Sequence, residues 1–481
     1  MNYTQTWRDR TDLSKNEYWK LEKDGLEILK ELDRLSTTPF EQIDVSDIER
    51  LKWAGIYCQR PKNGKFLIRI KLPSGKLNAA QGHIIADLAE QYGQSELQIT
   101  IRQCIQIHNL TLNEIPDIFR TLDSVGLTTV EGCGDVPRNI LGNPLMGIDP
   151  DELFDTTPIV HQAAEALVGN PEYSNLPRKY KISVSANPGD CGFAGINDLA
   201  FVPAILRKKD QKADGFHVYV GGGLSTNPML SKKLSFFILP EQAVLVMQAV
   251  AIIFREFGYR EKRNHCRLKF LVDDWGAEKF EAVLEKTAQK LLNHEDVSRL
   301  ADDLKDGEPA SPLFIRGGRT LWRKWNRGVF HGVHQQKQPG LYYVGFSIPE
   351  GAMDAGDLAA FADLAKQYGS GDLRTTNSQN LLLINIPKAN LKTVTSSALA
   401  QKFALRPGAF SGYCAACTGN EYCNFAPIET KHLLQNIVEA FGCALSGNQN
   451  AVPGQPHRLP PCLRPSHDRR YRDDWRPGPH R

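Results

Sequence analysis

The stretch "DLAEQYG" at residues 87–93 returns as "DLAKQYG" at residues 363–369, so the chain contains an internal repeat. The same offset aligns "KLPSG" at 71–75 with "SIPEG" at 347–351 without gaps. In each copy an alternating apolar run comes first, an Ala/Leu-rich helical stretch follows, and a second β-rich run closes the unit. The repeat therefore predicts a small strand–helix–strand unit of the α+β class that is used twice.

The two copies differ in charge at one position. The offset pairs Gln103 with Gln379, but Arg102 in "TIRQ" faces Ser378 in "TNSQ". Duplicated halves commonly pack around a pseudo-twofold axis, and a large cofactor fits the seam between them. Loss of the charge from the second copy predicts a single functional site, built mainly from the first copy. Two independent modules in series are the alternative, but no Gly/Ser/Pro-rich linker separates the copies.

Length and composition limit the class of protein. The chain has 481 residues, 41% of them hydrophobic, which is enough for two or three packed domains. It contains no run of 18 apolar residues, and its charged first residues lack the apolar core of a signal peptide. We therefore expect a cytoplasmic protein without a membrane span. Ten cysteines in so long a chain favour metal or redox use over a disulfide scaffold.

The net charge of +3 comes from the last thirty residues. The segment 452–481 holds seven Arg and three Asp, so the rest of the chain carries a formal charge of −1. The segment is rich in Pro and Arg and has no apolar period, which is typical of a disordered basic tail. Nucleic-acid binding would depend on this tail alone, and we expect no nucleic-acid partner.

Three cysteines precede a predicted amphipathic helix in "SGYCAACTGNEYCNFAPIETKHLLQNIVEAF", namely Cys414, Cys417 and Cys423. Thiolates before a helix N-terminus gain from its positive end. The spacing leaves four interpretations open. Cys414 and Cys417 could form half of a zinc site or a redox dithiol; Cys417 and Cys423 could bind an iron–sulfur cluster with two further thiolates; or the cysteines could be unligated.

Basic residues recur at the ends of β-rich runs in the repeat-bearing half. They are Arg102 in "ITIRQ", Arg138 in "GCGDVPRNILGNP", and Arg178, Lys179 and Lys181 in "NLPRKYKISVS". Strand alternation places Lys179 and Lys181 on one face. Each charge alone is most often a solvated surface group, but several together could make a cationic pocket for an anion.

These segments together resemble the ferredoxin-dependent nitrite reductases that contain sirohaem and a [4Fe–4S] cluster, close kin of the assimilatory sulfite reductases. The resemblance covers roughly residues 15–445. It is carried by "ITIRQ", "VPRNILGNPLMGIDPDELFDT", "SNLPRKYK", "INDLAFVPA", "GVHQQKQPGLYYVGF", "YGSGDLR" and "CTGNEYCNFAPIETK".

The resemblance implies an α+β fold, with duplicated ferredoxin-like half-domains and sirohaem/[4Fe–4S]-binding α+β domains around a pseudo-twofold axis. The expected division is an N-terminal helical segment at 1–55, a first half-domain at 56–125, a first sirohaem-binding domain at 126–320, a second half-domain at 325–400, the start of the [4Fe–4S]/sirohaem domain at 401–450, and the aberrant tail at 451–481.

The same resemblance implies the chemistry. Six electrons, delivered singly by ferredoxin or a similar donor, reduce nitrite to ammonia or sulfite to sulfide. Sirohaem carries eight carboxylates, so its pocket must be cationic. By family match, Arg102, Arg138, Lys179 and Lys181 would bind the substrate anion and relay protons. Gln336, Lys337 and Arg178 would contact the macrocycle, and Cys417 and Cys423 would be the first two cluster ligands. We expect a monomer.

Two departures from the family pattern matter. Plant and cyanobacterial nitrite reductases carry Asn where this chain has Lys181, whereas sulfite reductases carry Lys, so sulfite reduction is an alternative function. The family also supplies its other two cluster cysteines in a Thr-Gly-Cys-Pro-x-x-Cys stretch, but this region offers only Cys443 and Cys462, singly. An inactive, cofactor-free remnant is therefore a further alternative.

We interpret the tail as the missing motif translated in a shifted reading frame. If His457–Arg464 are encoded CAC CGG CTG CCC CCA TGC CTG CGC, reading from one base later gives Thr-Gly-Cys-Pro-His-Ala-Cys-Ala. Synonymous codons for Ser466–Trp475 give a stretch with Ala-Asp-Ile-Gly, the next family signature. The slip would lie between Phe441 and Val452, and accidental low complexity is the alternative.

Overall fold

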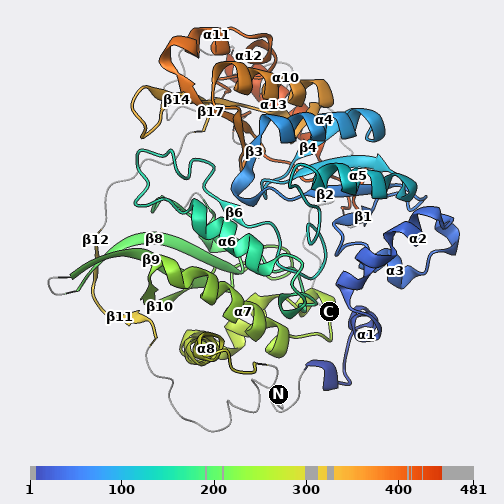
Figure 1. Ribbon diagram of the computed structural model, residues 1–481, viewed down its shortest axis with the longest axis vertical. Coiled ribbons are helices and arrows are strands. Elements are labelled where there is room, and N and C mark those ends of the chain that lie inside the picture. The colour runs from blue at the N-terminus through green and yellow to red at the C-terminus, as the bar shows by residue number, and fades with distance from the viewer. Residues whose placement is uncertain are drawn as a thin grey trace, which may run out of the picture.

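Two five-stranded antiparallel sheets form the upper part of the molecule (Figure 1). The first, in the order β1-β2-β5-β4-β15, contains β1 (Ile56–Cys58), β2 (Phe66–Ile70), β5 (Ile105–Leu110), β4 (Glu96–Ile99) and β15 (Ala352–Asp354). The second, in the order β13-β14-β17-β16-β3, contains β13 (Gly332–Gln335), β14 (Leu341–Phe346), β17 (Leu381–Pro387), β16 (Asp372–Thr375) and β3 (Lys76–Asn78). The structure, a computed structural model, describes residues 7–189, 192–208, 211–297, 313–321, 330–408, 411–412, 414–424 and 426–446.

Each half-domain gives one strand to the sheet of the other. Strand β3, from the first copy of the repeat, pairs with β16, and β15, from the second copy, pairs with β4. The exchange is reciprocal: Leu77 lies opposite Leu373, and Met353 lies opposite Leu97. The sequence repeat therefore corresponds to two interlocked half-domains related by a pseudo-twofold axis.

Two glutamines from equivalent positions reinforce the exchange. Gln103 donates through Nε2 to the carbonyl oxygen of Thr375 at 3.1 Å, and Gln379 donates through Nε2 to the carbonyl oxygen of Ile99 at 2.9 Å. Both side chains are almost fully buried. Each bond joins one half to the other, so the two copies are fixed in a single arrangement.

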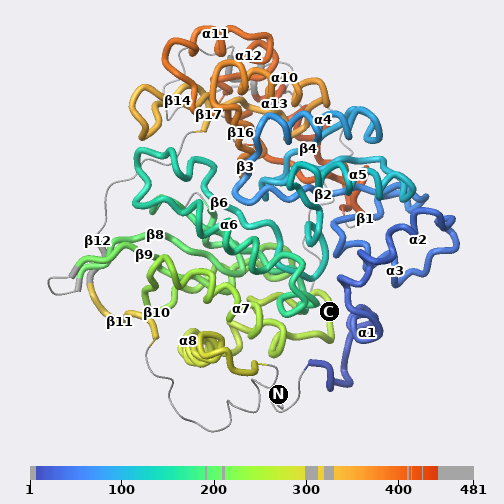
Figure 2. The backbone as a smooth tube through the Cα atoms, in the orientation of Figure 1, coloured from blue at the N-terminus to red at the C-terminus, as the bar shows by residue number. Residues whose placement is uncertain are grey.

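The helices of the two half-domains also meet. Helix α4 (Ala79–Tyr92) and helix α10 (Ala355–Tyr368) pack against each other in the upper part of the molecule (Figures 1 and 2). Each begins in a capping box, which for α4 is formed by Asn78 and Gln81. Their Ala-rich faces and the inner faces of both sheets share one apolar core. The expected α+β fold with duplicated ferredoxin-like half-domains is confirmed.

A larger central domain lies below the half-domains. Its seven-stranded sheet has the order β11-β10-β9-β8-β7-β6, with β12 paired to β8. The strands are β6 (Leu141–Gly142), β7 (Ile182–Val184), β8 (Leu199–Lys208), β9 (Gln211–Val220), β10 (Lys232–Ile238), β11 (Ile315–Arg316) and β12 (Arg319–Leu321), and the helices are α6 (Thr157–Leu167), α7 (Ala243–Phe257) and α8 (Leu268–Leu292). Helix α7 packs between α6 and α8 over a second apolar core.

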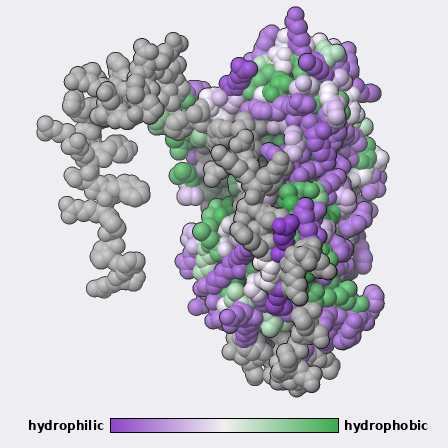
Figure 3. Space-filling model, turned by 90° about the vertical axis from the view of Figure 1, so that its left-hand side faces the viewer, coloured by the Kyte–Doolittle hydropathy of each residue, from purple (hydrophilic) through white to green (hydrophobic). Residues whose placement is uncertain are grey.

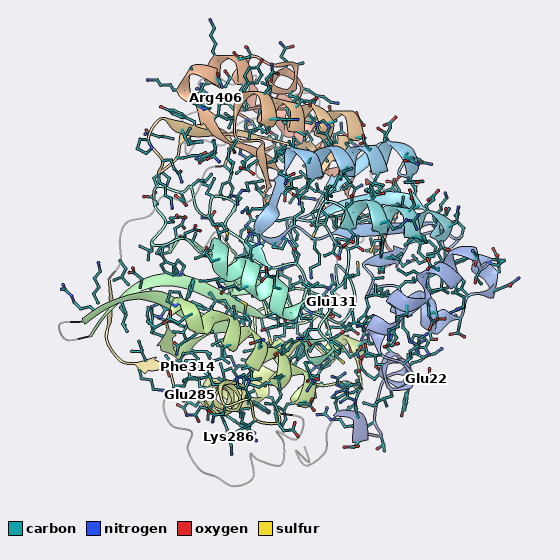
Figure 4. All side chains as sticks on the ribbon, viewed as in Figure 1. Glu22, Glu131, Glu285, Lys286, Phe314 and Arg406 are labelled. Carbon is teal, nitrogen blue, oxygen red and sulfur yellow. The ribbon has the colours of Figure 1, made fainter. Side chains whose placement is uncertain are left out.

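Glu285 on α8 anchors the segment through which the chain runs from the central domain toward the second half-domain. It accepts hydrogen bonds from the backbone N–H groups of Leu313 and Phe314 and pairs with Arg316 at 2.7 Å. Glu285 and Phe314 lie side by side at the foot of the central domain (Figure 4). These contacts set the position of β11 at the edge of the central sheet.

The other described α-helices are α5 (Ile115–Asp123) in the first half-domain and six helices toward the two ends of the chain. Those six are α1 (Lys15–Glu22), α2 (Leu32–Thr37), α3 (Val45–Arg50), α11 (Leu391–Thr395), α12 (Ala398–Lys402) and α13 (Lys431–Ser446). None of the helices among the described residues is long and apolar enough to cross a membrane. The face shown in Figure 3 is largely hydrophilic, with apolar side chains in small patches. The predicted tail at 451–481, including Cys462, and the side chain of Cys443 lie outside the described residues.

Candidate functional site

A cavity of about 750 Å³, the main cavity, lies where the first half-domain, the N-terminal helices and the central domain meet. Strands β2 and β5 supply one wall through alternation. Phe66 and Ile68 face the apolar core, whereas Leu67 and Arg69 line the cavity. On β5, Gln106 likewise faces the cavity. The sheet therefore presents polar groups to one side and its core to the other.

Arg102 enters the cavity from the turn between β4 and β5. Its guanidinium donates to Oδ1 of Asn197 at 2.7 Å and to the carbonyl oxygens of Asn139 at 3.4 Å and Ile182 at 3.3 Å. Burial lowers its pKa to about 10. The group stays charged at neutral pH, and protein acceptors fix its orientation.

Arg138 is held by the loop that precedes it. Its Nη1 donates to the carbonyl oxygen of Gly132 at 3.0 Å, which also accepts from Nη1 of Arg69 at 3.1 Å. Glu131, labelled in Figure 4, anchors the start of this loop by accepting a hydrogen bond from the N–H of Gly169. Burial lowers the pKa of Arg138 to about 10. One carbonyl oxygen therefore positions two guanidinium groups at the cavity wall.

Lys179 and Lys181 differ from the arginines in having no partner. Neither amine makes a hydrogen bond or ion pair with any residue in the described ranges. Burial, reinforced by Arg138, Arg178 and Arg267, lowers the pKa of Lys179 to about 7. Burial, reinforced by Arg102 and Lys179, lowers the pKa of Lys181 to about 6. Both amines can therefore exchange protons near neutral pH.

Arg178 belongs to a buried network centred on Asp135. The carboxylate of Asp135 pairs with Arg178 at 3.3 Å, Lys20 at 2.9 Å and Arg263 at 2.6 Å. Although burial opposes ionisation, Arg263, Lys20 and Arg178 hold the pKa of Asp135 well below its ordinary value. Helix α1, which carries Lys20, is thereby tied to the cavity wall.

The cysteine loop also lines the main cavity. Cys417 and Cys423 both line the cavity, whereas Cys414 does not. Next to them, the ring of Tyr422 packs against His108, with ring centroids 4.2 Å apart. Within the described residues, no group of three or more His, Cys, Asp or Glu side chains is placed to hold a metal ion.

The residues present fit an anionic macrocycle. Arg69 and Gln106 line the cavity, and within the described residues Arg69 Nε and Gln106 Nε2 have no hydrogen-bond partner. The ring nitrogens of His108, which does not itself line the cavity, have none there either. A native structure rarely leaves such donors unpaired, so a bound polar group is expected there. Eight carboxylates would meet a wall of arginine and lysine. For a four-thiolate cluster the fit is half complete: four cysteines line the cavity, but Cys104 and Cys133 are buried, and only Cys417 and Cys423 belong to the cysteine loop.

The sequence-predicted residues are brought together with two exceptions. Arg102, Arg138, Arg178, Lys179, Lys181, Cys417 and Cys423 all line the main cavity. Gln336 instead bonds Asn385 at 2.7 Å, and Lys337 pairs with Glu152. The pair Gln59 and Asn109 makes the equivalent contact in the first half at 3.0 Å. Gln336 is thus engaged in holding its half-domain, and its contact with the macrocycle stays a prediction, as does that of Lys337.

Sequence reasoning did not select Arg69, Gln106 or His108. The signal is present in "KFLIRIKL" and "CIQIHNL", where polar residues alternate with apolar ones that face the core. In the second half, the side chains from the equivalent sheet face are apolar: Tyr343, Leu382 and Ile384 pack against Leu145 and Ile148. That packing fills the position that the cavity occupies in the first half.

Comparison with known proteins agrees with this geometry. The sequence pattern of the nitrite/sulfite reductase ferredoxin-like half domain matches residues 59–125 and 334–401, and that of the nitrite and sulphite reductase 4Fe-4S domain matches residues 133–292. The chain belongs to the nitrite and sulfite reductase family. This family consists of oxidoreductases, and its cofactors are a [4Fe–4S] cluster and sirohaem.

Relatives of this family include enzymes named for both substrates. The ferredoxin–nitrite reductase of Synechococcus elongatus is 36% identical over 90% of this chain and 81% of its own length. The sulfite reductase [ferredoxin] 1 of Mycolicibacterium paratuberculosis is 32% identical over 89% and 76%, respectively. The solved structure of Mycobacterium tuberculosis NirA matches with a TM-score of 0.83 at 30% identity, covering 94% of this chain and 82% of that one.

Proposed function

We propose that this protein belongs to the branch that reduces nitrite to ammonia by six electrons, with reduction of sulfite to sulfide as the second candidate. The observation that carries the proposal is the convergence of Arg102, Arg138, Lys179 and Lys181 on one cavity that Cys417 and Cys423 also line. Both substrates are small anions, and preorganised cations stabilise negative charge on them. Both substrates remain candidates, because one relative is named a nitrite reductase and another a sulfite reductase.

The four cations would divide the work by their protonation. Arg102 and Arg138 keep their charge and have fixed orientations, so they would bind and orient the anion. Lys179 and Lys181 have pKa values near neutrality, so Nζ of each can give a proton to a substrate oxygen that leaves as water. Sirohaem, when bound, supplies the electrons at the substrate's central atom.

The residues that would hold the cofactors follow from the cavity wall. Arg69, Gln106 and Arg178 would bind carboxylates of the macrocycle, and Cys417 and Cys423 would provide two cluster thiolates. A ferredoxin is the proposed electron donor, because relatives over nine-tenths of the chain are named for it. A monomer in the cytoplasm stays a prediction of the sequence, which gel filtration and cell fractionation test.

We also propose that the chain as written is impaired. The shifted-frame interpretation places the second pair of cluster cysteines outside its amino-acid sequence. A cluster held by two thiolates would be lost, because an incomplete ligand set binds metal weakly.

The experiment uses the frame-restored protein, in which the shifted reading frame of the C-terminal segment is corrected. It compares variants at two positions, Arg102 and Ser378, that are equivalent in the two halves. Arg102→Ala should reduce nitrite and sulfite turnover by about 100-fold, as loss of a charge-stabilising donor does. Ser378→Ala, at the equivalent position in the second half, should leave both rates within about twofold, because Ser378 bonds only local groups such as Thr376. Equal losses in the two variants would refute the assignment of the site to the first half.

A further inference from the structure

A second, smaller cavity adjoins the main cavity. This side pocket, of about 240 Å³, shares Arg178, Lys179 and Arg263 with the wall of the main cavity. Its outer rim is the loop 224–226, whose residues are exposed. The side pocket therefore connects the protein surface to the wall that carries the unpartnered Lys179.

Every ionisable residue that lines the side pocket is a cation. In addition to the three shared residues, they are Arg267 and Lys269. Asp198 pairs with Arg267 at 2.8 Å, Asp135 pairs with Arg178 and Arg263, and Glu17 lies 3.7 Å from Arg263, but none of these carboxylates lines the side pocket. Five basic side chains thus line the pocket, whereas their three carboxylate partners lie behind them, which leaves an excess of positive charge facing the pocket.

The rim of the side pocket is held from below by Lys269. This side chain belongs to a residue that is only 1% exposed, and its Nζ donates to the carbonyl oxygens of Thr226 and Asn227, each at 2.6 Å. The carbonyl oxygens of Gly223 and Leu224 lie at 3.3 and 3.4 Å from the same nitrogen. The charge of Lys269 is therefore fixed in place, and it pairs with no carboxylate in the part of the chain that the structure describes.

We propose that the side pocket binds a small inorganic oxyanion and serves as an antechamber from which the substrate passes Lys179 into the main cavity. The inference rests on the proposed function, since it assigns the anion as nitrite or sulfite. The pocket volume suits a small anion, and its charge is unneutralised on the open side. Such a site raises the local concentration of substrate beside the reaction centre.

The test measures sulfite binding directly, by equilibrium dialysis of radiolabelled sulfite against the 481-residue chain at low ionic strength. Leu224→Glu places a carboxylate at the rim, where it competes with the anion for the same cations. Leu224 is 56% exposed, so the substitution disturbs little packing. We expect about tenfold weaker binding at one class of site, with the loss diminishing as salt is added.

Two matched variants separate the pocket from general surface charge. Leu230→Glu adds the same charge at a side chain that is 75% exposed and does not line the side pocket, and we expect less than about a twofold change. Leu224→Gln adds a polar side chain of similar size without the charge and should retain binding. Equal weakening by Leu224→Glu and Leu230→Glu would overturn the proposal.

A final experiment tests whether the side pocket binds the substrate or a carboxylate group of sirohaem. A metal-free octacarboxylate porphyrin should leave the Leu224-sensitive sulfite binding in place; displacement of that sulfite would assign the pocket to the macrocycle and overturn the antechamber. Because dialysis needs no turnover, failure of the frame-restored protein to reduce either anion would refute the proposed function without altering this result.

Discussion

Lys181 is the residue at which the two candidate substrates separate. Its amine lies among Arg102, Lys179 and Arg267 and has no partner within the described chain. A lysine adds a charge and a proton donor beside the anion, which suits the more highly charged sulfite. In the frame-restored protein, Lys181→Asn should lower kcat/KM for sulfite about tenfold more than for nitrite. Steady-state assays with both anions check this, and an unchanged ratio would show that Lys181 does not contact substrate.

The same lysine should reduce the stability of the fold at acid pH. Its pKa in the folded state, about 6, lies below the ordinary value of 10.5, so the folded state binds fewer protons than the unfolded state between these values. The free energy of unfolding therefore rises with pH across this window and is lowest below about pH 6. Lys181→Met should stabilise the chain by about 1–2 kcal/mol near pH 6 and by less at pH 9.

Urea unfolding of Lys181→Met at the two pH values measures this difference. Lys233→Met is the control, because burial also lowers the pKa of Lys233 although this side chain is far less buried than that of Lys181. A stabilisation by Lys181→Met that is independent of pH would mean that burial and the neighbouring cations do not disfavour the charged form of the Lys181 amine.

Among individual site residues, those in short loops could be predicted from the sequence, whereas those inside strands were missed. Arg102, Arg138, Lys179 and Lys181 were all predicted for the site, and the structure places all four in the main cavity. Arg69 was missed because an arginine in an apolar strand has the same pattern whether its outer face meets solvent or a cofactor. Only tertiary structure shows what covers that face.

Among the secondary-structure elements, helix α1 has a more important contact than its sequence suggests. Glu17 is fully buried and pairs with Arg260, which is also fully buried, and with Lys20 at 2.6 Å. Glu17→Ala would leave Arg260 charged and uncompensated in the interior. We expect a loss of about 3–5 kcal/mol in the free energy of unfolding, measured by urea denaturation.

Glu22→Ala provides the control on the same helix. Glu22, labelled in Figure 4, has a side chain that is 65% exposed and pairs with Arg50 at 3.4 Å. An exposed ion pair contributes little, so this variant should lose no more than about 1 kcal/mol. Similar losses in the two variants would mean that α1 is held by its apolar contacts instead of by the buried ion pair.

The repeat in the sequence predicted the elements of the half-domains but not the exchange of strands. The alternation in "LYYVGFSI" indicates a strand, and the Ala/Leu-rich stretch after it indicates a helix, as found at β14 and α10. Nothing in the three residues of β15 says which sheet they join, because an edge strand has the same residue pattern in either sheet. The choice is made by the packing of α4 against α10.

For the whole molecule, the decisive measurement is cofactor content. The chain as written should lack the visible bands of sirohaem and contain far fewer than four irons after purification, because two cluster thiolates are absent from its predicted ligand set. Restoring the shifted frame after Phe441 should bring back both. Absorption spectra and iron analysis of the two proteins compare them directly.

Two results would contradict this. Full occupancy in the chain as written would require other ligands, from Cys414, Cys443 or Cys462 or from Cys104 and Cys133 at the cavity wall. The second result would come from sequencing the source DNA. If the third bases of codons 457–475 do not permit the shifted reading, the frameshift interpretation is wrong and the tail is predicted to be a disordered segment.

The exchange of β3 and β15 has a consequence for the order of events on the ribosome. Strand β4 of the first sheet can be made early in synthesis, but its neighbour β15 begins at Ala352. Until then the first half-domain has an open edge, and the whole central domain is translated in the meantime. Exposed edges invite pairing with other chains. We therefore expect a nascent chain of this protein to stay prone to pairing with other chains until β15 has been made.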